Sequence, residues 1–438
     1  MKVTNWGRFP VVHADVVSPL SREDAVAAIG SAGQIARGLG RSYGDASLAP
    51  RIVSSLRLDH FLDFDREKGT IRCEAGVSFD SLLKLILPEG WFLPVTPGTK
   101  YITVGGAIAA DVHGKNHHKE GSFGRFVHEL KLLDAQGKLL TCSLTENPEL
   151  FAATLGGMGL TGIITEATFR LKKVETAWIS QHTYKAHNLD QIFRLFEEHR
   201  QDTYTMAWID CLATGSDVGK SVLFTGKHST MDELSPSARQ QPMQIKEKFK
   251  LNIPFPLPHF VLNNYAVKAF NALYFARHRH GHKQVVPYEP FFYPLDGILN
   301  WNRMYGSRGF IQYQCVLPLE KSYDGLSEIL QMVAGRGGGS FLAVLKLFGP
   351  QDGLMSFPMS GYTLALDFPL EDSLLPFLDK LDEKVAAFGG RIYLAKDARM
   401  SREIFEATYP NLPQFRELLS KFDPEKKFRS RQSARLGI

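Results

Sequence analysis

The 438-residue sequence contains few cysteines and no long hydrophobic segment. Its four cysteines are Cys73, Cys142, Cys211 and Cys315. They form no CxxC pair, and their spacing is not that of metal ligands. Such scattered cysteines predict buried thiols in a reducing compartment. The sequence begins with no signal-peptide pattern and holds no apolar run that would span a bilayer. We therefore expect a cytoplasmic protein without a membrane-spanning helix.

A strong charge imbalance is also missing. The formal net charge is +5, and 44% of the residues are apolar and 22% charged. This mild basic excess does not indicate a nucleic-acid-binding protein. The length predicts two or three globular domains, and we find no internal repeats.

The first informative segment is a glycine loop between two predicted strands. A strand at 34–37 runs into the loop 38–45, and a second strand follows at 52–58. Asp59 lies about twenty residues after the start of this loop, which is the spacing of the acidic residue in a Rossmann dinucleotide site. However, Pro50 leaves no room for the helix that a βαβ crossover needs. The sequence therefore predicts a different kind of nucleotide site and excludes a nicotinamide dehydrogenase.

Two more glycine-rich segments follow, at 96–124 and 156–162. In the first of these, Gly105 and Gly106 open a small-residue helical turn, which would offer free N–H groups to an anion. Small residues also let the backbone approach a flat ligand closely. Around these loops we expect helices at 20–30, 78–87 and 149–155, and strands at 70–74, 127–134, 138–143 and 163–171. The pattern indicates one extended ligand lying along this half of the chain.

The second half predicts an antiparallel sheet with helices on one side. Its strands are expected at 204–212, 221–225, 309–317, 341–348 and 361–368, and its helices at 320–334 and 372–388. Polar residues recur within these strands with a period of two, at Gln312, Gln314, Lys346, Thr363 and Asp367. They therefore point to one face. Because the flanking residues are strongly apolar, a polar cavity explains them better than a solvated outer face.

From 248 to 288 the sequence has no Asp or Glu. Its basic and aromatic residues are Lys248, Lys250, Lys268, Arg277, Arg279 and Lys283, with Phe249, Phe255, Phe260, Phe270, Tyr274 and Phe275 among them. Three prolines, Pro254, Pro256 and Pro258, exclude a regular element at its start. The pattern is typical of a peripheral membrane contact, with an ordinary long loop as the alternative. His278, His280 and His282 alternate, but without acidic or cysteine companions we expect no metal site.

These segments together resemble the FAD-dependent oxidases with the para-cresol methylhydroxylase/vanillyl-alcohol oxidase fold. Within that family the sequence is most similar to the decaprenylphosphoryl-β-D-ribose 2′-oxidase group. The resemblance rests on RGLGRSYGD (37–45), residues 96–124, GGMGLTGII (156–164), GFIQYQ (309–314), LKLFGP (345–350), SFPMSGYTLALDFP (356–369), GGRIYLAKDAR (389–399) and FDPEKKF (422–428). It implies an α+β fold in which a two-part FAD-binding domain joins a substrate domain with an antiparallel sheet flanked by helices. The domains would be 1–175 for FAD, 176–390 for substrate with a flexible basic insert at about 228–290, and 391–438 returning to the FAD domain.

The resemblance also implies which residues bind FAD. The first loop would wrap its pyrophosphate, and the remaining residues would line the flavin and ADP: Arg37, Gly38, Leu39, Gly40, Arg41, Ser42, Tyr43, Gly44, Asp45, Gly98, Thr103, Val104, Gly105, Gly106, Ala110, Asp111, Val112, His113, Ile164 and Tyr393. Many relatives attach FAD covalently through a histidine of the first loop. Here that loop carries Arg41, Ser42 and Tyr43, so we expect non-covalent FAD, with His113 as the alternative attachment point.

By position, Lys396, Tyr43 and His113 would be the catalytic residues of a sugar-hydroxyl oxidation. Substrate would contact Lys115, Gln312, Gln314, Lys346, Thr363 and Ala365. Lys396 has the alternative of a structural ion pair with Asp397 or Asp367, and the sequence assigns the general base to no single residue. Mycobacterial members carry a cysteine at the position of Ala365, to which nitroaromatic inhibitors attach.

The implied reaction is oxidation of C2 of a polyprenylphosphoryl-β-D-ribose to a keto group. This step is the first half of epimerisation to the arabinose form of a cell wall polysaccharide precursor. It implies a lipid-linked or phosphorylated sugar substrate, a short-chain reductase partner and peripheral contact with the inner membrane face. The alternatives are a flavin oxidase of a soluble aldonolactone or alditol, and a flavin-binding scaffold without turnover.

Overall fold

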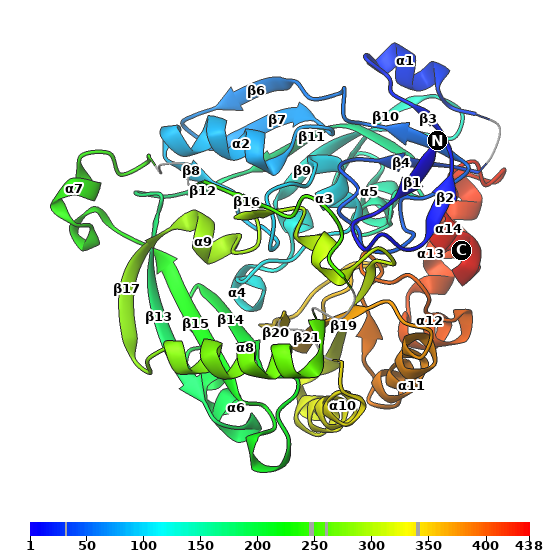
Figure 1. Ribbon diagram of the computed structural model, residues 1–438. Coiled ribbons are helices and arrows are strands. Elements are labelled where there is room, and N and C mark those ends of the chain that lie inside the picture. The colour runs from blue at the N-terminus through cyan, green and yellow to red at the C-terminus, as the bar shows by residue number, and fades with distance from the viewer. Residues whose placement is uncertain (31–32, 245–248, 259–261, 339–341) are drawn as a thin grey trace.

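Two smaller sheets and one large antiparallel sheet form the framework (Figure 1). The computed structural model describes residues 1–30, 33–244, 249–258, 262–338 and 342–438. A parallel sheet has the order β3-β5-β4, with β3 Asp15–Val17, β4 Gln34–Arg37 and β5 Arg51–Ser54. An antiparallel sheet has the order β10-β9-β11-β7-β6, with β6 Phe61–Asp65, β7 Thr70–Glu74, β9 Val127–Leu133, β10 Leu139–Ser143 and β11 Ile163–Arg170.

The large sheet has the order β17-β13-β15-β14-β20-β21-β19-β22, and its neighbouring strands are antiparallel. Its strands are β13 Trp178–Ala186, β14 Tyr204–Ile209, β15 Ser221–His228, β17 His282–Pro287, β19 Phe310–Pro318, β20 Ala343–Phe348, β21 Gly361–Pro369 and β22 Arg391–Ile392. Three two-stranded pairs complete the strands: β1 Lys2–Thr4 with β2 Val11–His13, β8 Trp91–Phe92 with β12 Lys172–Lys173, and β16 Leu251–Asn252 with β18 Ile298–Leu299.

The helices lie between and around these sheets. Around the smaller sheets they are α1 Arg22–Ala27, α2 Phe79–Ile86, α3 Val104–Ala109, α4 His117–Glu120 and α5 Pro148–Thr154. With the large sheet come α6 Leu189–Glu198, α7 Pro236–Arg239, α8 Asn264–Arg277, α9 Tyr288–Phe292, α10 Ser322–Arg336 and α11 Leu374–Ala387. The C-terminal helices are α12 Arg402–Thr408, α13 Leu412–Phe422 and α14 Arg431–Leu436. This mixed arrangement confirms the α+β prediction.

Local sequence signals account for the elements around the glycine loops. Ser21 caps α1 by accepting a hydrogen bond from the Asp24 amide at 3.1 Å, and Ser78 caps α2 in the same way. The predicted strands 34–37 and 70–74 form with those bounds as β4 and β7. Strands β4 and β5 pair in parallel, and no helix lies in the connection 38–50. This geometry confirms that the first glycine loop is not part of a Rossmann crossover.

The large sheet has one polar face, as its register shows. Gln312 lies opposite Asp367, and Lys346 lies opposite Thr363. Paired residues share a face, so these side chains project to the same side. The helices α6, α10 and α11 pack with the apolar core on the other side, as expected for a sheet covered by helices. The polar face looks towards the second glycine segment, because Gln314 Nε2 lies 3.2 Å from His113 Nε2. The predicted cavity would therefore lie between the large sheet and that segment.

The segment 228–290 is more regular than the sequence indicates. The three prolines do exclude a helix or strand at 253–258, but α8 and β17 follow. Strand β17 forms the edge of the large sheet by pairing with β13. Helix α8 packs on the polar-face side, where Tyr274 lies 4.7 Å from Trp208 between ring centroids. The prediction of an irregular segment is therefore wrong for its second half. Lys248 and Phe260 lie outside the described residues.

The C-terminal segment returns to the N-terminal sheets, and Figure 1 shows the red helices beside the blue strands. Gln34 of β4 forms an isolated parallel bridge with Phe428. The amide of Arg429 donates to the Gln34 carbonyl at 2.8 Å. Among the described residues, no helix has the length and apolar character needed to cross a bilayer.

Candidate active site

The first glycine loop is held by backbone contacts that leave no room for side chains. A Cβ atom added at Gly44 would lie 1.8 Å from the Asp397 carbonyl oxygen, and one at Gly38 would lie 2.2 Å from Thr103 Oγ1. Gly40 adopts φ +63°, which favours glycine. The Tyr43 amide donates to the Ala395 carbonyl at 2.9 Å. The loop thus lies directly against the C-terminal segment.

Two arginines of this loop carry charges without a carboxylate partner. Arg37 donates to the Thr4 carbonyl at 2.8 Å, and its Nε is buried without a partner. Burial and the neighbouring Arg41 lower the pKa of Arg37. Arg41 lies over the Trp6 ring at 4.3 Å. Among the described residues neither arginine forms an ion pair, so both are available to an anion such as a pyrophosphate.

The carboxylate of Asp45 has a structural role in the same loop. Asp45 accepts two hydrogen bonds from Arg435, at 2.9 and 3.2 Å, and Arg435 also donates to Asp397 at 2.7 Å. These three residues fasten the loop to the C-terminal segment. The carboxylate of Asp45 is therefore already neutralised by Arg435.

The second glycine segment forms α3, but its amides are less free than the sequence suggests. Val104 and Gly105 donate to the carbonyls of Val77 and Ala75, and Gly106 donates to Thr103 Oγ1 at 3.2 Å. The expectation of free N–H groups at this turn is therefore wrong. Gly105 is needed for close packing, since its added Cβ would lie 3.0 Å from the Ala75 Cβ.

The side chain of Asp111, which follows α3, connects separate loops by hydrogen bonds. Its carboxylate accepts hydrogen bonds from the Gly124 amide at 2.8 Å, Ser356 at 2.6 Å and Gln351 at 3.2 Å. Burial raises the pKa of Asp111. The Met158 amide of the third glycine loop donates to Ala109 nearby, which brings the second and third loops together.

Other predicted cofactor residues differ in accessibility. Val104 is completely buried, so its side chain offers no surface to a cofactor, while Val112 and Ile164 retain 8% and 6% exposure. Gly98 is exposed, and an added Cβ would meet no atom within 4 Å. Leu39 and Ser42 are half-buried in the first loop.

An aromatic wall surrounds His113. Its ring lies 4.8 Å from Phe348, 5.1 Å from Tyr393 and 5.7 Å from Phe357, between centroids. Tyr393 donates to the Ala110 carbonyl at 3.2 Å. Burial, and next the charge of Lys346, hold the pKa of His113 well below its usual value. His113 Nδ1 is buried and has no hydrogen-bond partner among the described residues, so it is able to bond to a polar group of a ligand.

Three half-buried lysines converge on the polar face from separate segments. Burial, together with the charges of Lys115 and Lys396, lowers the pKa of Lys346 to about 7. Burial likewise lowers the pKa of Lys115 to about 8. None of the three forms an ion pair within 4.0 Å in the described part of the chain. Such a cluster is stabilised when an anion enters the cavity.

The nearest carboxylate to Lys396 belongs to Asp367 on β21. Asp367 is fully buried, accepting from Gln312 Nε2 at 2.6 Å and from Tyr305 at 3.0 Å. Burial raises the pKa of Asp367 and lowers that of Lys396, while each charge favours the other. Lys396 Nζ lies 3.6 Å from the centroid of the Tyr43 ring. Asp397 pairs with Arg435 instead, so it is not the partner of Lys396.

The remaining predicted substrate residues lie on the same face. Gln314 donates to Thr363 Oγ1 at 3.1 Å, and its amide nitrogen lies 3.2 Å from His113 Nε2. Ala365 stands opposite Gln314 in the register. Sequence reasoning missed Tyr305, for which no motif existed. It noted Asp367 as polar but gave it no role in the site, although an acidic residue within an apolar strand was the available signal.

The comparisons agree with this geometry. Residues 14–143 match the family described as FAD binding domain. Over its full length the chain is 36% identical to the decaprenylphosphoryl-β-D-ribose oxidase of Mycolicibacterium smegmatis, of which it covers 97%. The chain belongs to the decaprenylphosphoryl-β-D-ribose oxidase family. Members of this family are FAD-dependent oxidoreductases that act on CH–OH groups, so this chain is one as well.

Two more distant relatives are also named as oxidases. An alditol oxidase of Streptomyces sp. is 22% identical over 97% of this chain and 96% of its own length. A putative D-arabinono-1,4-lactone oxidase of Neurospora crassa is 31% identical over 35% of this chain and 27% of its own. The resemblance seen in the sequence is thus confirmed at the level of the family.

The residues present fit FAD. The glycine loop brings backbone and two unpaired arginines together, as a pyrophosphate requires. Among the described residues, His113 Nδ1 has no hydrogen-bond partner and is able to bond to a polar group of the cofactor. No atom lies within 4 Å of a Cβ added at Gly98, so a flat ring is able to approach the backbone there. Contacts of Gln314 with His113, of Lys396 with Tyr43 and of Met158 with Ala109 bring the three glycine segments and the polar face together as the candidate site.

Proposed function

We propose that this protein oxidises C2 of a polyprenylphosphoryl-β-D-ribose to a keto group. The observation that carries this proposal is the convergence of Lys115, Lys346 and Lys396, none of which forms an ion pair within 4.0 Å in the described part of the chain. Three cations in one cavity suit a phosphorylated substrate better than a neutral alditol or lactone. The full-length similarity to an oxidase of decaprenylphosphoryl-β-D-ribose supports the same substrate class.

FAD, bound without a covalent link, supplies the acceptor for the hydride that leaves the carbinol carbon. Arg37 and Arg41 neutralise its pyrophosphate, and Tyr393 and His113 lie beside the ring-binding space. Residues 1–175 and 391–438 form the cofactor-binding part, and 176–390 form the substrate part. Flavin is expected in the supernatant after acid precipitation, because the first loop carries no histidine. Flavin in the pellet would contradict non-covalent binding.

The chain's own residues position the sugar and handle its hydroxyl proton. Lys346 and Lys115 bind the phosphate, and Gln312, Gln314 and Thr363 orient the ribose hydroxyls. Lys396 and Tyr43 contact the reacting hydroxyl. A lysine with a lowered pKa is able to accept that proton near neutral pH, and Asp367 favours the charged form that results. The polar face thus combines phosphate binding with proton acceptance.

The expected partners follow from this chemistry. The keto product would require a short-chain reductase to complete an epimerisation. A lipid-linked substrate would bring the enzyme to the membrane surface, and the acid-free segment beyond residue 248 supports such contact.

An anaerobic absorbance titration tests the proposal. Purified protein is titrated with a short-chain prenylphosphoryl-β-D-ribose, and the flavin band is expected to bleach near one equivalent. Bleaching only with an alditol or aldonolactone would instead favour the soluble-substrate alternative. A yellow protein that no sugar bleaches would support a scaffold without turnover.

A further inference from the structure

Helix α8 is apolar on both of its sides, although it lies at the surface. Val267, Asn271 and Phe275 face the protein and are buried. The opposite side carries Tyr265, 86% exposed, and Leu273, 72% exposed. Exposed alanines lie between them at 266, 269, 272 and 276. A helix that is apolar all round normally has cover on every side. The outer side of α8 therefore requires an apolar environment.

The charges around this helix are of one sign. No Asp or Glu occurs between 249 and 288. The exposed residues Lys268, Arg277, Arg279 and Lys283 form no ion pair within 4.0 Å in the described ranges. Unneutralised cations beside an apolar strip match the chemistry of an anionic lipid surface, where headgroup phosphates lie above acyl chains.

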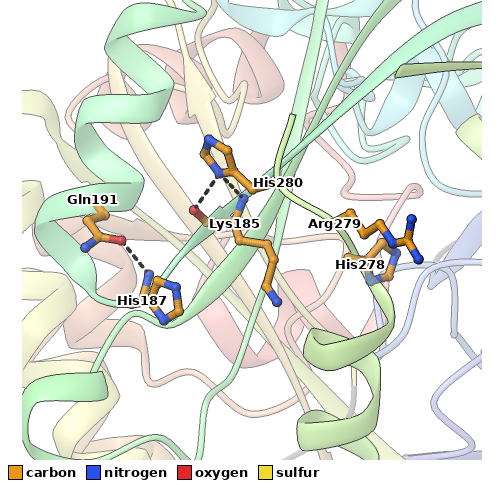
Figure 2. A pocket seen from close by; sticks show the side chains of 6 residues that line it. All are labelled: Lys185, His187, Gln191, His278, Arg279 and His280. Atoms are coloured by element: carbon orange, nitrogen blue, oxygen red, sulfur yellow. Dashed lines mark hydrogen bonds between the residues drawn. The ribbon is translucent and has the colours of Figure 1, made fainter. Parts of the chain in front are cut away.

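A basic hollow of about 550 Å³ lies at the carboxyl end of α8 (Figure 2). It is lined by Lys185, His187, Gln191, His278, Arg279 and His280. His280 Nδ1 lies 3.2 and 3.3 Å from the backbone nitrogen and oxygen of Lys185, which fixes its ring at the centre of the hollow. The lining contains no carboxylate, so the hollow is suited to an anion.

The ammonium group of Lys185, which lines the hollow, shares the ring of Phe275 with a second ammonium group, that of Lys220. Lys185 Nζ lies 4.0 Å and Lys220 Nζ 4.7 Å from the centroid of Phe275. Lys220 is paired with Asp217 at 3.4 Å, whereas Lys185 has no carboxylate partner in the described part of the chain. The ring holds the Lys185 charge in place, and a phosphate in the hollow would neutralise it.

We propose that the hollow binds the phosphate of an anionic phospholipid while the outer side of α8 lies in the bilayer interface. The membrane contact proposed above thereby acquires a defined surface. Because α8 packs beside Trp208 on the cavity face, a membrane at α8 borders the cavity from which a lipid-linked substrate would extend. This inference deepens the proposed membrane contact, but phosphate binding in the hollow does not depend on which sugar the enzyme oxidises.

Vesicle sedimentation with the full-length, FAD-loaded protein tests this proposal. Binding to phosphatidylglycerol/phosphatidylcholine vesicles is expected to exceed binding to phosphatidylcholine alone and to fall as salt rises. The double variant Lys185→Gln/Arg279→Gln should lose about 30-fold in affinity, since each interfacial charge contributes about fivefold. Its matched control is Arg57→Gln/Lys380→Gln, which removes two exposed charges elsewhere.

A second pair of variants tests the apolar side. Leu273→Asp should lower vesicle affinity about tenfold or more, because a leucine leaves the lipid and a charge enters. Leu144→Asp, at an 80% exposed leucine on another surface, should leave it unchanged. Because neither Leu273 nor Leu144 packs in the core, both variants should keep the thermal unfolding temperature of the native protein.

Four results would overturn the proposal. Equal binding to both vesicle types, or equal binding by both double variants, would remove the role of the hollow. Stabilisation by millimolar inorganic phosphate without vesicle binding would assign the hollow to a soluble phosphate. A dimer that dissociates in Leu273→Asp, again without vesicle binding, would assign α8 to a second copy. None of these four results affects the bleaching of flavin by a short-chain soluble substrate. Failure of the lipid-binding proposal is therefore distinguishable from failure of the proposed enzymatic activity.

Discussion

Replacing Lys346 by methionine should stabilise the flavin-free protein and abolish its activity. Methionine has a similar length and removes only the charge. Lys346 has a pKa of about 7, against 10.5 for the free side chain. The unfolded chain therefore binds this proton more readily than the folded chain does. The resulting cost is fully present below about pH 7 and is lost as the pH rises towards 10.5.

This shift sets the size of the effect. The lowered pKa of Lys346 corresponds to a loss of unfolding free energy of about 4 kcal/mol at pH 7 and about 2 kcal/mol at pH 9 in a site without water. Because Lys346 is half-buried at an open cavity, water reduces these values by about half. We expect Lys346→Met to be about 2 kcal/mol more stable at pH 7 and about 1 kcal/mol at pH 9.

Urea unfolding at the two pH values measures the difference. Lys380→Met, at an exposed lysine, serves as the control and should change nothing. With FAD restored, Lys346→Met should no longer bleach with the phosphorylated substrate. A variant that is less stable at pH 7, or whose gain does not depend on pH, would refute the burial cost that we assign to Lys346.

Three further predictions concern the site. Lys396→Met should keep FAD yet slow flavin bleaching by about 100-fold or more in stopped flow, because the proton-accepting group is lost; an unchanged rate would remove Lys396 from catalysis. Gly44→Ala should abolish FAD retention, since its Cβ would lie 1.8 Å from the Asp397 carbonyl, whereas Gly335→Ala, which meets no atom within 4 Å, should retain FAD fully. Nitroaromatic inhibitors should leave the intact mass of the native protein unchanged, while Ala365→Cys should gain one adduct; an adduct on the native chain would show another reactive nucleophile.

The elements with strong local signals were predictable. Strands β4 and β7 have the predicted bounds, and the period-two pattern of β19, β20 and β21 identified the polar face of the large sheet. These features depend on neighbouring residues alone, through alternation, caps and glycine loops. The family resemblance added the cofactor and the reaction.

The errors have tertiary causes. Helix α8 was missed because it is apolar on both sides and so lacks a helical periodicity. The amides of Gly105 and Gly106 were expected to be free, but they donate to the Ala75 carbonyl of a distant segment and to Thr103 Oγ1. No local pattern reveals such partners. The place of Asp111 beside the flavin stays a prediction, but the hydrogen bonds of its carboxylate to Gly124, Gln351 and Ser356 depend on segments far apart in sequence and had no local signal.

The link between Asp45 and Arg435 bears on how the enzyme matures. The two residues lie 390 positions apart in sequence, and Asp397 shares the same guanidinium. Contacts of such separation form late, because a very long loop must close first. We therefore expect the first glycine loop to reach its final shape after the large sheet between these residues has formed. Uptake of flavin, followed by quenching of its fluorescence, would report the completion of folding rather than its beginning.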